Sequence, residues 1–334
     1  MIRDRARLVE RLRTIHAAIR DEVVASCERS AIEVLETPVD EQAGDTIFAI
    51  DRVSEAVLVH HFEELAREWP LVLVAEGLGA SGRGTLPAGA TPELVVLVDP
   101  IDGTRGLMVQ KRSAWILTGV APYRDERQTL ASIELAMQTE IPLVKQHLSD
   151  AFIAWSDGGA LQLRGERFDR LHRTHVAIAP RPSRATTIEH GFGNLARFFP
   201  GPRALLATID DALIERVLGP QPPGRARAFE DQYICSAGQM AELLAGHDRW
   251  CADLRPLVWK KLGVRGLCCH PYDLAAELVA RAAGVIVCDP SGAPLAAPMF
   301  DVEHDVAWCG FANAAIRDQV LPTLQALLVE HGLS

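Results

Sequence analysis

Two aspartates three positions apart follow a strongly apolar segment of the chain. Leu94–Val98 (LVVLV) leads directly into Asp99–Thr104 (DPIDGT). Carboxylates held this close force one of them to take up a proton unless a cation joins them. A hard divalent ion satisfies both, because such ions prefer oxygen ligands. The segment therefore indicates a metal site, while a strand exit in which Asp and Gly supply ordinary turn chemistry explains the same residues.

The remaining residues of this segment suit a ligand site. Pro100 keeps the exit from the apolar segment extended. Gly103 allows the backbone to approach a ligand closely, and the hydroxyl of Thr104 can orient a water molecule.

Another carboxylate follows a second buried strand. Glu76 comes directly after Leu71–Ala75, and we expect this strand to lie beside the one that leads to Asp99. Ligands bind at the carboxyl ends of parallel strands in such sheets. Glu76 is therefore expected near Asp99.

Three more aspartates have both a functional and a structural interpretation. Asp45 and Asp51 flank the extended segment 46–50, and Asp51 can cap the helix that we expect next. Asp45 follows a glycine and can simply begin a strand. Asp273 begins an expected helix over 273–283, where the helix dipole favours a carboxylate without any metal.

Two other motifs compete for a function. Residues 77–82 (GLGASG) have the GxGxxG spacing of a dinucleotide site, but the prolines and glycine at 87–92 leave no room for the helix that such a site needs. Cys251, Cys268, Cys269 and His270 are conceivable zinc ligands. Because adjacent cysteines point apart on a strand, buried apolar thiols explain them better.

The pattern of apolar residues predicts the elements that position these groups. Apolar residues at helical spacing over 8–23 predict a long first helix, and residues 51–67 a second. The Pro-rich segment 179–183 is the expected boundary between two lobes, and 219–224 (GPQPPG) is an expected surface loop. Further expected elements are strands over 71–75, 94–98, 115–120, 132–137, 151–154, 175–179 and 285–288, and helices over 236–244 and 273–283.

Composition limits the classes of partner. The 334 residues carry a formal net charge of −10, from 34 basic and 44 acidic residues without a basic block. A nucleic-acid polymer or an anionic membrane surface is therefore not expected as a partner. Seven scattered cysteines without a CxxC pair indicate reduced thiols, and no apolar run approaches the roughly 20 residues that span a bilayer. We expect a cytoplasmic protein.

The whole chain resembles the magnesium-dependent inositol monophosphatase family, within the fructose-1,6-bisphosphatase superfamily. Asp99–Thr104 matches the Asp-Pro-Ile-Asp-Gly-Thr signature of that family at every position. The resemblance implies an α+β fold, a layered αβαβα sandwich with two lobes. Residues 1–184 would carry the main metal-binding motif, and residues 185–334 the last metal aspartate and substrate contacts.

The resemblance also assigns roles to single residues. It implies that two or three Mg²⁺ ions are held by Glu76, Asp99, the carbonyl of Ile101, Asp102 and Asp273. It implies that Asp45 and Thr104 activate the attacking water. Phosphate and substrate contacts would come from Gly103, Thr104, Ser236 and Ala237.

Several departures from the family concern the substrate. Gly77 follows Glu76 in place of a second acid, Tyr272 stands where tryptophan is usual, and the stretch 265–269 lacks the glutamate that contacts inositol. We therefore expect a Mg²⁺-dependent phosphomonoesterase for a small phosphorylated polyol, sugar or nucleotide, with inositol 1-phosphate first, acting as a homodimer. The alternatives are a 3'-phosphoadenosine 5'-phosphate nucleotidase, a fructose-1,6-bisphosphatase, or an inactive binding member of the fold.

Overall fold

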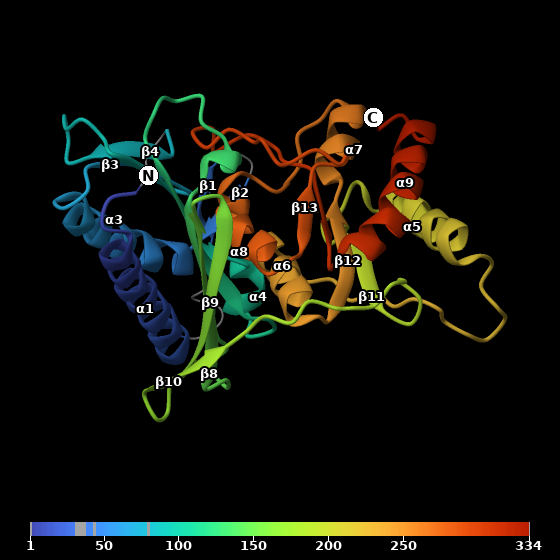
Figure 1. Cartoon of the computed structure of the whole chain (residues 1–334), viewed down its shortest axis with the longest axis horizontal. Coiled ribbons are helices and arrows are strands. Elements are labelled where there is room, and N and C mark those ends of the chain that lie inside the picture. The colour runs from blue at the N-terminus through green and yellow to red at the C-terminus, as the bar shows by residue number, and fades with distance from the viewer. Residues whose placement is uncertain (1, 31–37, 43–44, 79–80, 334) are drawn as a thin grey trace.

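Helices and sheets alternate in five layers across the molecule (Figure 1). The computed structural model describes residues 2–30, 38–42, 45–78 and 81–333, with the backbone alone at 38–42 and 45–56. From one side to the other lie a helix pair, a large sheet, a middle helix layer, a small sheet and an outer helix pair. Three clusters of buried apolar side chains fill the spaces between these layers.

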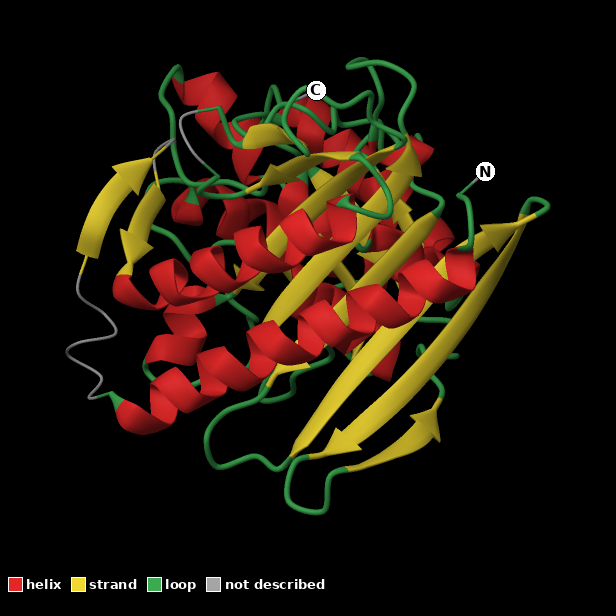
Figure 2. Ribbon diagram, turned by 90° about the vertical axis from the view of Figure 1, so that its left-hand side faces the viewer, coloured by secondary structure: helices red, strands yellow, loops and turns green. Residues whose placement is uncertain are grey.

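The first layer consists of two long helices that lie on one face of the large sheet (Figure 2). They are α1 (Arg5–Arg29) and α3 (Ala49–Ala66), close to the two helices predicted. The apolar residues that predicted the first helix, Leu8, Leu12, Ile15, Ile19 and Val23, are all buried in α1. Burial of this stripe against the sheet holds the helix in place.

The large sheet is mixed. Its strand order is β10-β9-β8-β7-β6-β5-β3-β4, and β3 and β5 form its parallel pair. Helices cover both faces of its centre, so β5 is buried at every position. The strands are β3 (Leu71–Ala75), β4 (Arg83–Leu86), β5 (Leu94–Asp102), β6 (Ala114–Pro122), β7 (Leu135–Ile141), β8 (Leu148–Asp157), β9 (Ala160–Asp169) and β10 (Thr174–Ile178). A separate hairpin pairs β1 (Pro38–Gln42) with β2 (Asp45–Phe48).

The rest of the chain builds the middle and outer layers. The small sheet has the order β11-β12-β14-β13. Its strands are β11 (Phe192–Leu195), β12 (Asp248–Asp253), β13 (Ile286–Cys288) and β14 (Trp308–Phe311). The helices are α4 (Thr104–Met108), α5 (Arg203–Leu218), α6 (Ser236–Ala245), α7 (Arg255–Leu262), α8 (Glu277–Ala282) and α9 (Ala314–Glu330).

The structure corrects three predicted elements. The helix expected over 273–283 is divided into a 3₁₀ turn, Tyr272–Leu274, and the short helix α8. The division lies where the chain packs against β6: a Cβ at Gly119 would lie 2.4 Å from the carbonyl oxygen of Ala275. Ser132 belongs to a 3₁₀ turn that precedes β7. Asp51 does not cap α3, because that helix begins two residues earlier, at Ala49.

The irregular backbone expected at two segments and the free thiols agree with the structure. The Pro-rich segment 179–183 is irregular and connects the edge strand β10 towards the small sheet, and 219–224 is an irregular loop after α5. All seven cysteines are free, and six of them are buried. Within the described residues, no helix combines the length and apolarity needed to cross a membrane.

Candidate metal centre

The parallel pair of strands brings the first two predicted ligands together. Ala75 of β3 is the register partner of Val98 of β5. Glu76 follows Ala75 and Asp99 follows Val98, so these two acids lie at the same edge of the sheet. Both side chains line one pocket, which confirms the expected neighbourhood of these two acids.

An irregularity in β5 places the second aspartate. The register between β5 and β6 shifts between Asp99, which faces Leu117, and Asp102, which faces Trp115. Such a bulge redirects side chains, and the carboxylate of Asp99 supports it by accepting a hydrogen bond from the amide of Ile101 at 2.9 Å. The carboxylates of Asp99 and Asp102 consequently line the same pocket.

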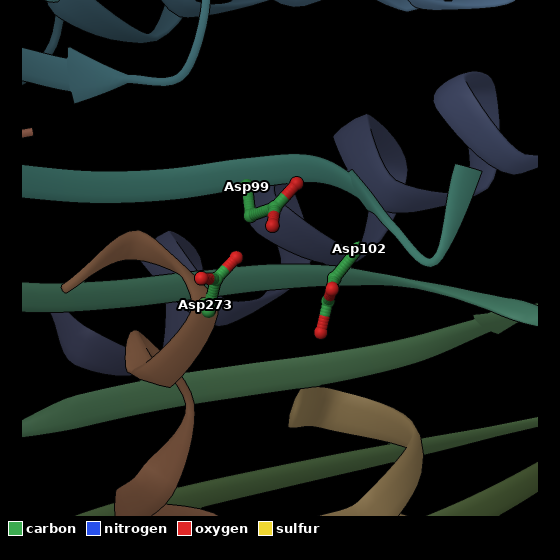
Figure 3. A group of neighbouring side chains, drawn as sticks. All are labelled: Asp99, Asp102 and Asp273. Carbon is green, nitrogen blue, oxygen red and sulfur yellow. The ribbon is translucent and has the colours of Figure 1, made fainter. Parts of the chain in front are cut away.

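The third aspartate, Asp273, belongs to the 3₁₀ turn before α8. Oxygen atoms of Asp99, Asp102 and Asp273 lie within 4.8 Å of one another, and this is the metal-ligand cluster found among the described residues. Figure 3 shows Asp273 opposite Asp99. The amide of His270 donates a hydrogen bond of 2.6 Å to Asp273, which holds the carboxylate of this turn in the pocket.

Burial and mutual repulsion dominate the electrostatics of this cluster. Burial raises the pKa of Asp99 well above its usual range, and the charges of Glu76, Asp102 and Asp273 raise it further. Burial likewise raises the pKa of Asp102 to about 7, opposed by the hydrogen bond from the amide of Ala237. Burial and the charge of Asp102 raise the pKa of Asp273. A cation among the three acids would relieve this repulsion and favour their charged forms.

The loop after β5 leaves its backbone open to close approach by a ligand. Gly103 has a φ of +103°, and a Cβ there would lie 3.0 Å from the Sγ of Cys235. A side chain at this position would meet both backbone strain and a steric contact. The hydroxyl of Thr104 donates to the carbonyl of Ile101 at 3.0 Å, so both predicted site residues lie beside the cluster.

The beginning of α6 closes another side of the pocket. Ser236 lines the pocket, and the amide of Ala237 donates a hydrogen bond of 2.6 Å to Asp102. That amide therefore orients a predicted ligand in this structure. The Sγ of Cys235 accepts a hydrogen bond from the amide of Gly238, so this thiol caps α6.

The predicted water-activating aspartate lies partly outside the described residues. Asp45 is the first residue of β2 and pairs with Gln42 of β1. Its side chain is not among those described, so its role stays a prediction.

The pocket contains residues that the sequence did not reveal. Its further lining includes Arg105 of α4, Phe198 and Phe199 after β11, and Arg255 at the start of α7. These residues belong to no recognisable sequence motif.

The described residues of the two competing motifs lack the structure that their proposed sites need. From residue 81 the segment 77–82 leads into β4, which is antiparallel to β3, so no helix begins there in its described part. Burial raises the pKa of Cys268 and of Cys269, as expected of apolar thiols. No zinc-like group that includes them occurs among the described side chains.

Solved structures with a similar fold are known. A fructose-1,6-bisphosphatase of Leishmania major in holo form has a TM-score of 0.67 and 13% identity, over 96% of this chain and 93% of that one. The extragenic suppressor protein SuhB of Bartonella henselae has a TM-score of 0.62 and 14% identity, over 95% of this chain and 98% of that one. An IMPase of Thermotoga maritima has a TM-score of 0.58 and 17% identity, over 96% of this chain and 99% of that one. Neither a protein-family model nor a curated protein matches the sequence.

Proposed function

We propose that this chain, which has the layered α+β fold of the inositol monophosphatase and fructose-1,6-bisphosphatase superfamily, is a metal-dependent phosphomonoesterase. The observation that carries the proposal is the cluster of Asp99, Asp102 and Asp273 beside Glu76 in one pocket. Fold alone does not establish activity, since one fold hosts several functions. The proposal therefore rests on the chemistry of these side chains.

The donor set fits hard divalent ions. Asp99, Asp102 and Asp273 offer carboxylate oxygens, Glu76 adds another, and the carbonyl of Ile101 lies in the same loop. Mg²⁺ prefers such oxygen ligands. Bound there, two or three Mg²⁺ ions would stabilise charge on the entering and leaving oxygens of an in-line displacement.

Residues of the chain itself orient the attacking water and accept its proton. The hydroxyl of Thr104 lies beside the carbonyl of Ile101 and can orient the attacking water, but a hydroxyl is a poor base. Asp45 is the proposed acceptor of the proton. The amides of Gly103 and Thr104 would contact the phosphate. Water attacks phosphorus directly and loses a proton to Asp45, the P–O ester bond breaks, and the departing alkoxide takes up a proton from solvent to become the alcohol, so no phosphoenzyme forms.

A small phosphorylated metabolite is the proposed substrate, with inositol 1-phosphate first. A 3'-phosphoadenosine 5'-phosphate nucleotidase and a fructose-1,6-bisphosphatase are the alternatives. Of the three solved structures above, a fructose-1,6-bisphosphatase has the highest TM-score. A sugar bisphosphate therefore stays among the proposed substrates. A binding protein without activity is the remaining alternative.

Phosphate release by the purified chain tests the proposal. We expect turnover of at least one phosphorylated metabolite with Mg²⁺, none in excess EDTA, and little with Ca²⁺, which is larger and takes less regular geometry. Phosphate release that persists undiminished in EDTA contradicts the metal-dependent mechanism. A protein that binds these metabolites without releasing phosphate is the inactive member of the fold.

A further inference from the structure

One edge strand of the large sheet is open along its length. β10 pairs only with β9, in a regular antiparallel register from Thr174 to Ile178. Its first four residues are exposed, with Val176 at 60%, and the strand lies at the lower margin of the molecule in Figure 1. In the part of the chain that the structure describes, no hydrogen bond from outside the sheet reaches the backbone of β10. The outward N–H and C=O groups of this strand can therefore pair with another strand.

The other three edges of the two larger sheets are protected. β4, at the opposite end of the large sheet, begins with Arg83 and is followed directly by Pro87. β11 is covered by Phe229, whose backbone exchanges hydrogen bonds with Gly191 and Gly193. β13 has only three residues. Charge, proline, cover and shortness are the usual protections of an edge, whereas β10 has no lysine, acid, proline or register shift.

The residues of β10 suit strand pairing. Thr174, Val176 and Ile178 are β-branched, and they share one face of the strand because side chains alternate along it. On the other face, the ring of His175 packs against Phe168 with 4.7 Å between the ring centres. The strand is therefore already ordered, which lowers the entropic cost of adding a partner strand.

The surroundings of β10 are strongly basic. Residues 160–184 contain six arginines and two acids, although the whole chain has a net charge of −10. Arg173 directly precedes β10, Arg164 adjoins its last residue in the neighbouring strand, and Arg181 follows shortly after it. We call these three the end arginines. Arg164 and Arg181 are exposed, and neither forms an ion pair with another described residue.

Charge decides which partner fits this edge. A second copy of β10 would bring two sets of end arginines into one interface, and like charges placed together weaken binding. A strand with acids near both of its ends would instead meet opposite charge at both ends of β10. Recognition of this kind takes its affinity from backbone hydrogen bonds and its specificity from side chains.

We propose that β10 is a docking site for an extended acidic peptide segment of another protein, which adds a ninth strand to the large sheet. Backbone hydrogen bonds along Thr174–Ile178 would hold the segment, and apolar side chains would pack beside Val176. Acidic groups near its ends would meet the end arginines. This interaction goes beyond the proposed phosphatase activity and does not depend on it.

Three labelled peptides test the inference on the full chain. EVTVTVE has β-branched residues and an acid at each end, KVTVTVK reverses the charge, and EVTPTVE cannot complete the ladder because proline lacks an N–H. Fluorescence anisotropy should show saturable binding of EVTVTVE, binding of KVTVTVK that is at least tenfold weaker, and no saturable binding of EVTPTVE. The difference between the first two should shrink at high salt, because the end arginines are exposed.

Hydrogen exchange locates the bound peptide. With EVTVTVE bound, the outward amides within residues 174–178 should exchange at least tenfold more slowly, because they become hydrogen-bonded. The amides of the covered edge strand β11 should be unchanged.

Matched variants separate this docking from general effects. Val176→Glu places an acid in the middle of the edge and should weaken EVTVTVE binding about tenfold or more, while Val329→Glu in α9, where the valine is 66% exposed, should not. Arg181→Glu should weaken EVTVTVE binding about three- to tenfold and strengthen KVTVTVK binding. Arg127→Glu, in the loop after β6, should change neither, although the side chain of this arginine is 90% exposed. Circular dichroism like that of the wild type confirms that each variant folds.

Each contrary outcome has a definite meaning. Absence of saturable EVTVTVE binding, or protection that falls outside β10, overturns the inference. Equal binding of EVTVTVE and KVTVTVK would show that the edge does not select acidic segments, which overturns it as well. Self-association of the wild type that Val176→Glu abolishes would show that a second copy occupies the edge, and the proposed partner would then be wrong.

Discussion

Replacement of Asp102 by asparagine should separate the stability of this protein from its activity. The carboxyl of Asp102 is buried with 8% of the residue exposed, and it accepts a hydrogen bond from the amide of Ala237. Asparagine keeps the shape and the acceptor oxygen while it removes the charge. We therefore expect Asp102→Asn to fold, to be more stable than the wild type without metal at high pH, and to lose activity.

The pKa of Asp102 gives the magnitude and the sign. Burial raises this pKa from 3.8 to about 7, so the folded protein binds the proton more tightly than the unfolded chain does. Below pH 4 the carboxyl is protonated in both the folded and the unfolded state, so it does not lower the free energy of unfolding. The free energy of unfolding falls between pH 4 and 7, and above pH 7 the full loss is about 4 kcal/mol, as an upper bound. Asparagine should restore about 2–4 kcal/mol at pH 8 and almost nothing at pH 4.

Urea unfolding with and without Mg²⁺ measures both halves of this prediction. In EDTA at pH 8 the variant should unfold at higher urea than the wild type. Added Mg²⁺ should stabilise the wild type, because an ion that binds only the folded state shifts the equilibrium, and it should stabilise the variant much less. Phosphate release should fall about a hundredfold or more, the scale of one lost electrostatic group.

Asp248→Asn is the matched control. Asp248 lies in β12 with 5% exposed, outside the pocket, and burial raises its pKa to about 7 as well. This variant should gain stability at pH 8 but keep its response to Mg²⁺ and its activity. If Asp102→Asn keeps wild-type turnover and responds to Mg²⁺ as the wild type does, the assignment of Asp102 to the metal site is wrong.

Three further predictions concern other parts of the site. Asp45→Asn and Thr104→Ala should each lower kcat strongly with little change in KM, and the double variant should lose little more, because residues that act as a unit are not additive; multiplicative losses would refute the pair. Gly103→Ala should lower both the unfolding midpoint and kcat, because φ is +103° and Cys235 is only 3.0 Å from the added Cβ; a variant like wild type in both assays contradicts this. Arg255→Ala leaves the fully buried Asp253 unpaired and should cost about 3–5 kcal/mol in urea unfolding, and a cost below about 1 kcal/mol would show that the pair is not needed.

Local patterns in the sequence were sufficient for much of the fold. The apolar stripe of α1 and the continuous apolar runs of β3 and β5 predict their elements, because helix and strand periods differ and both strands are covered on two faces. The same reasoning placed Glu76 and Asp99 at one edge of the sheet, because parallel neighbours bring their carboxyl ends together. The metal-site hypothesis for Asp99–Thr104 also needed only adjacent residues.

Tertiary structure decided what depends on contacts between distant segments. Asp273 joins Asp99 and Asp102 across about 170 residues, and the helix expected to begin at Asp273 is divided because its backbone packs against Gly119 of β6. No periodic pattern encodes such a contact, since it depends on how two layers meet. The contact between Arg105 of α4 and the ring of Phe199 after β11 arises in the same way, because these two segments meet only when the layers have packed. The sequence by itself determined which groups can do the chemistry, and packing determined which of them share one pocket.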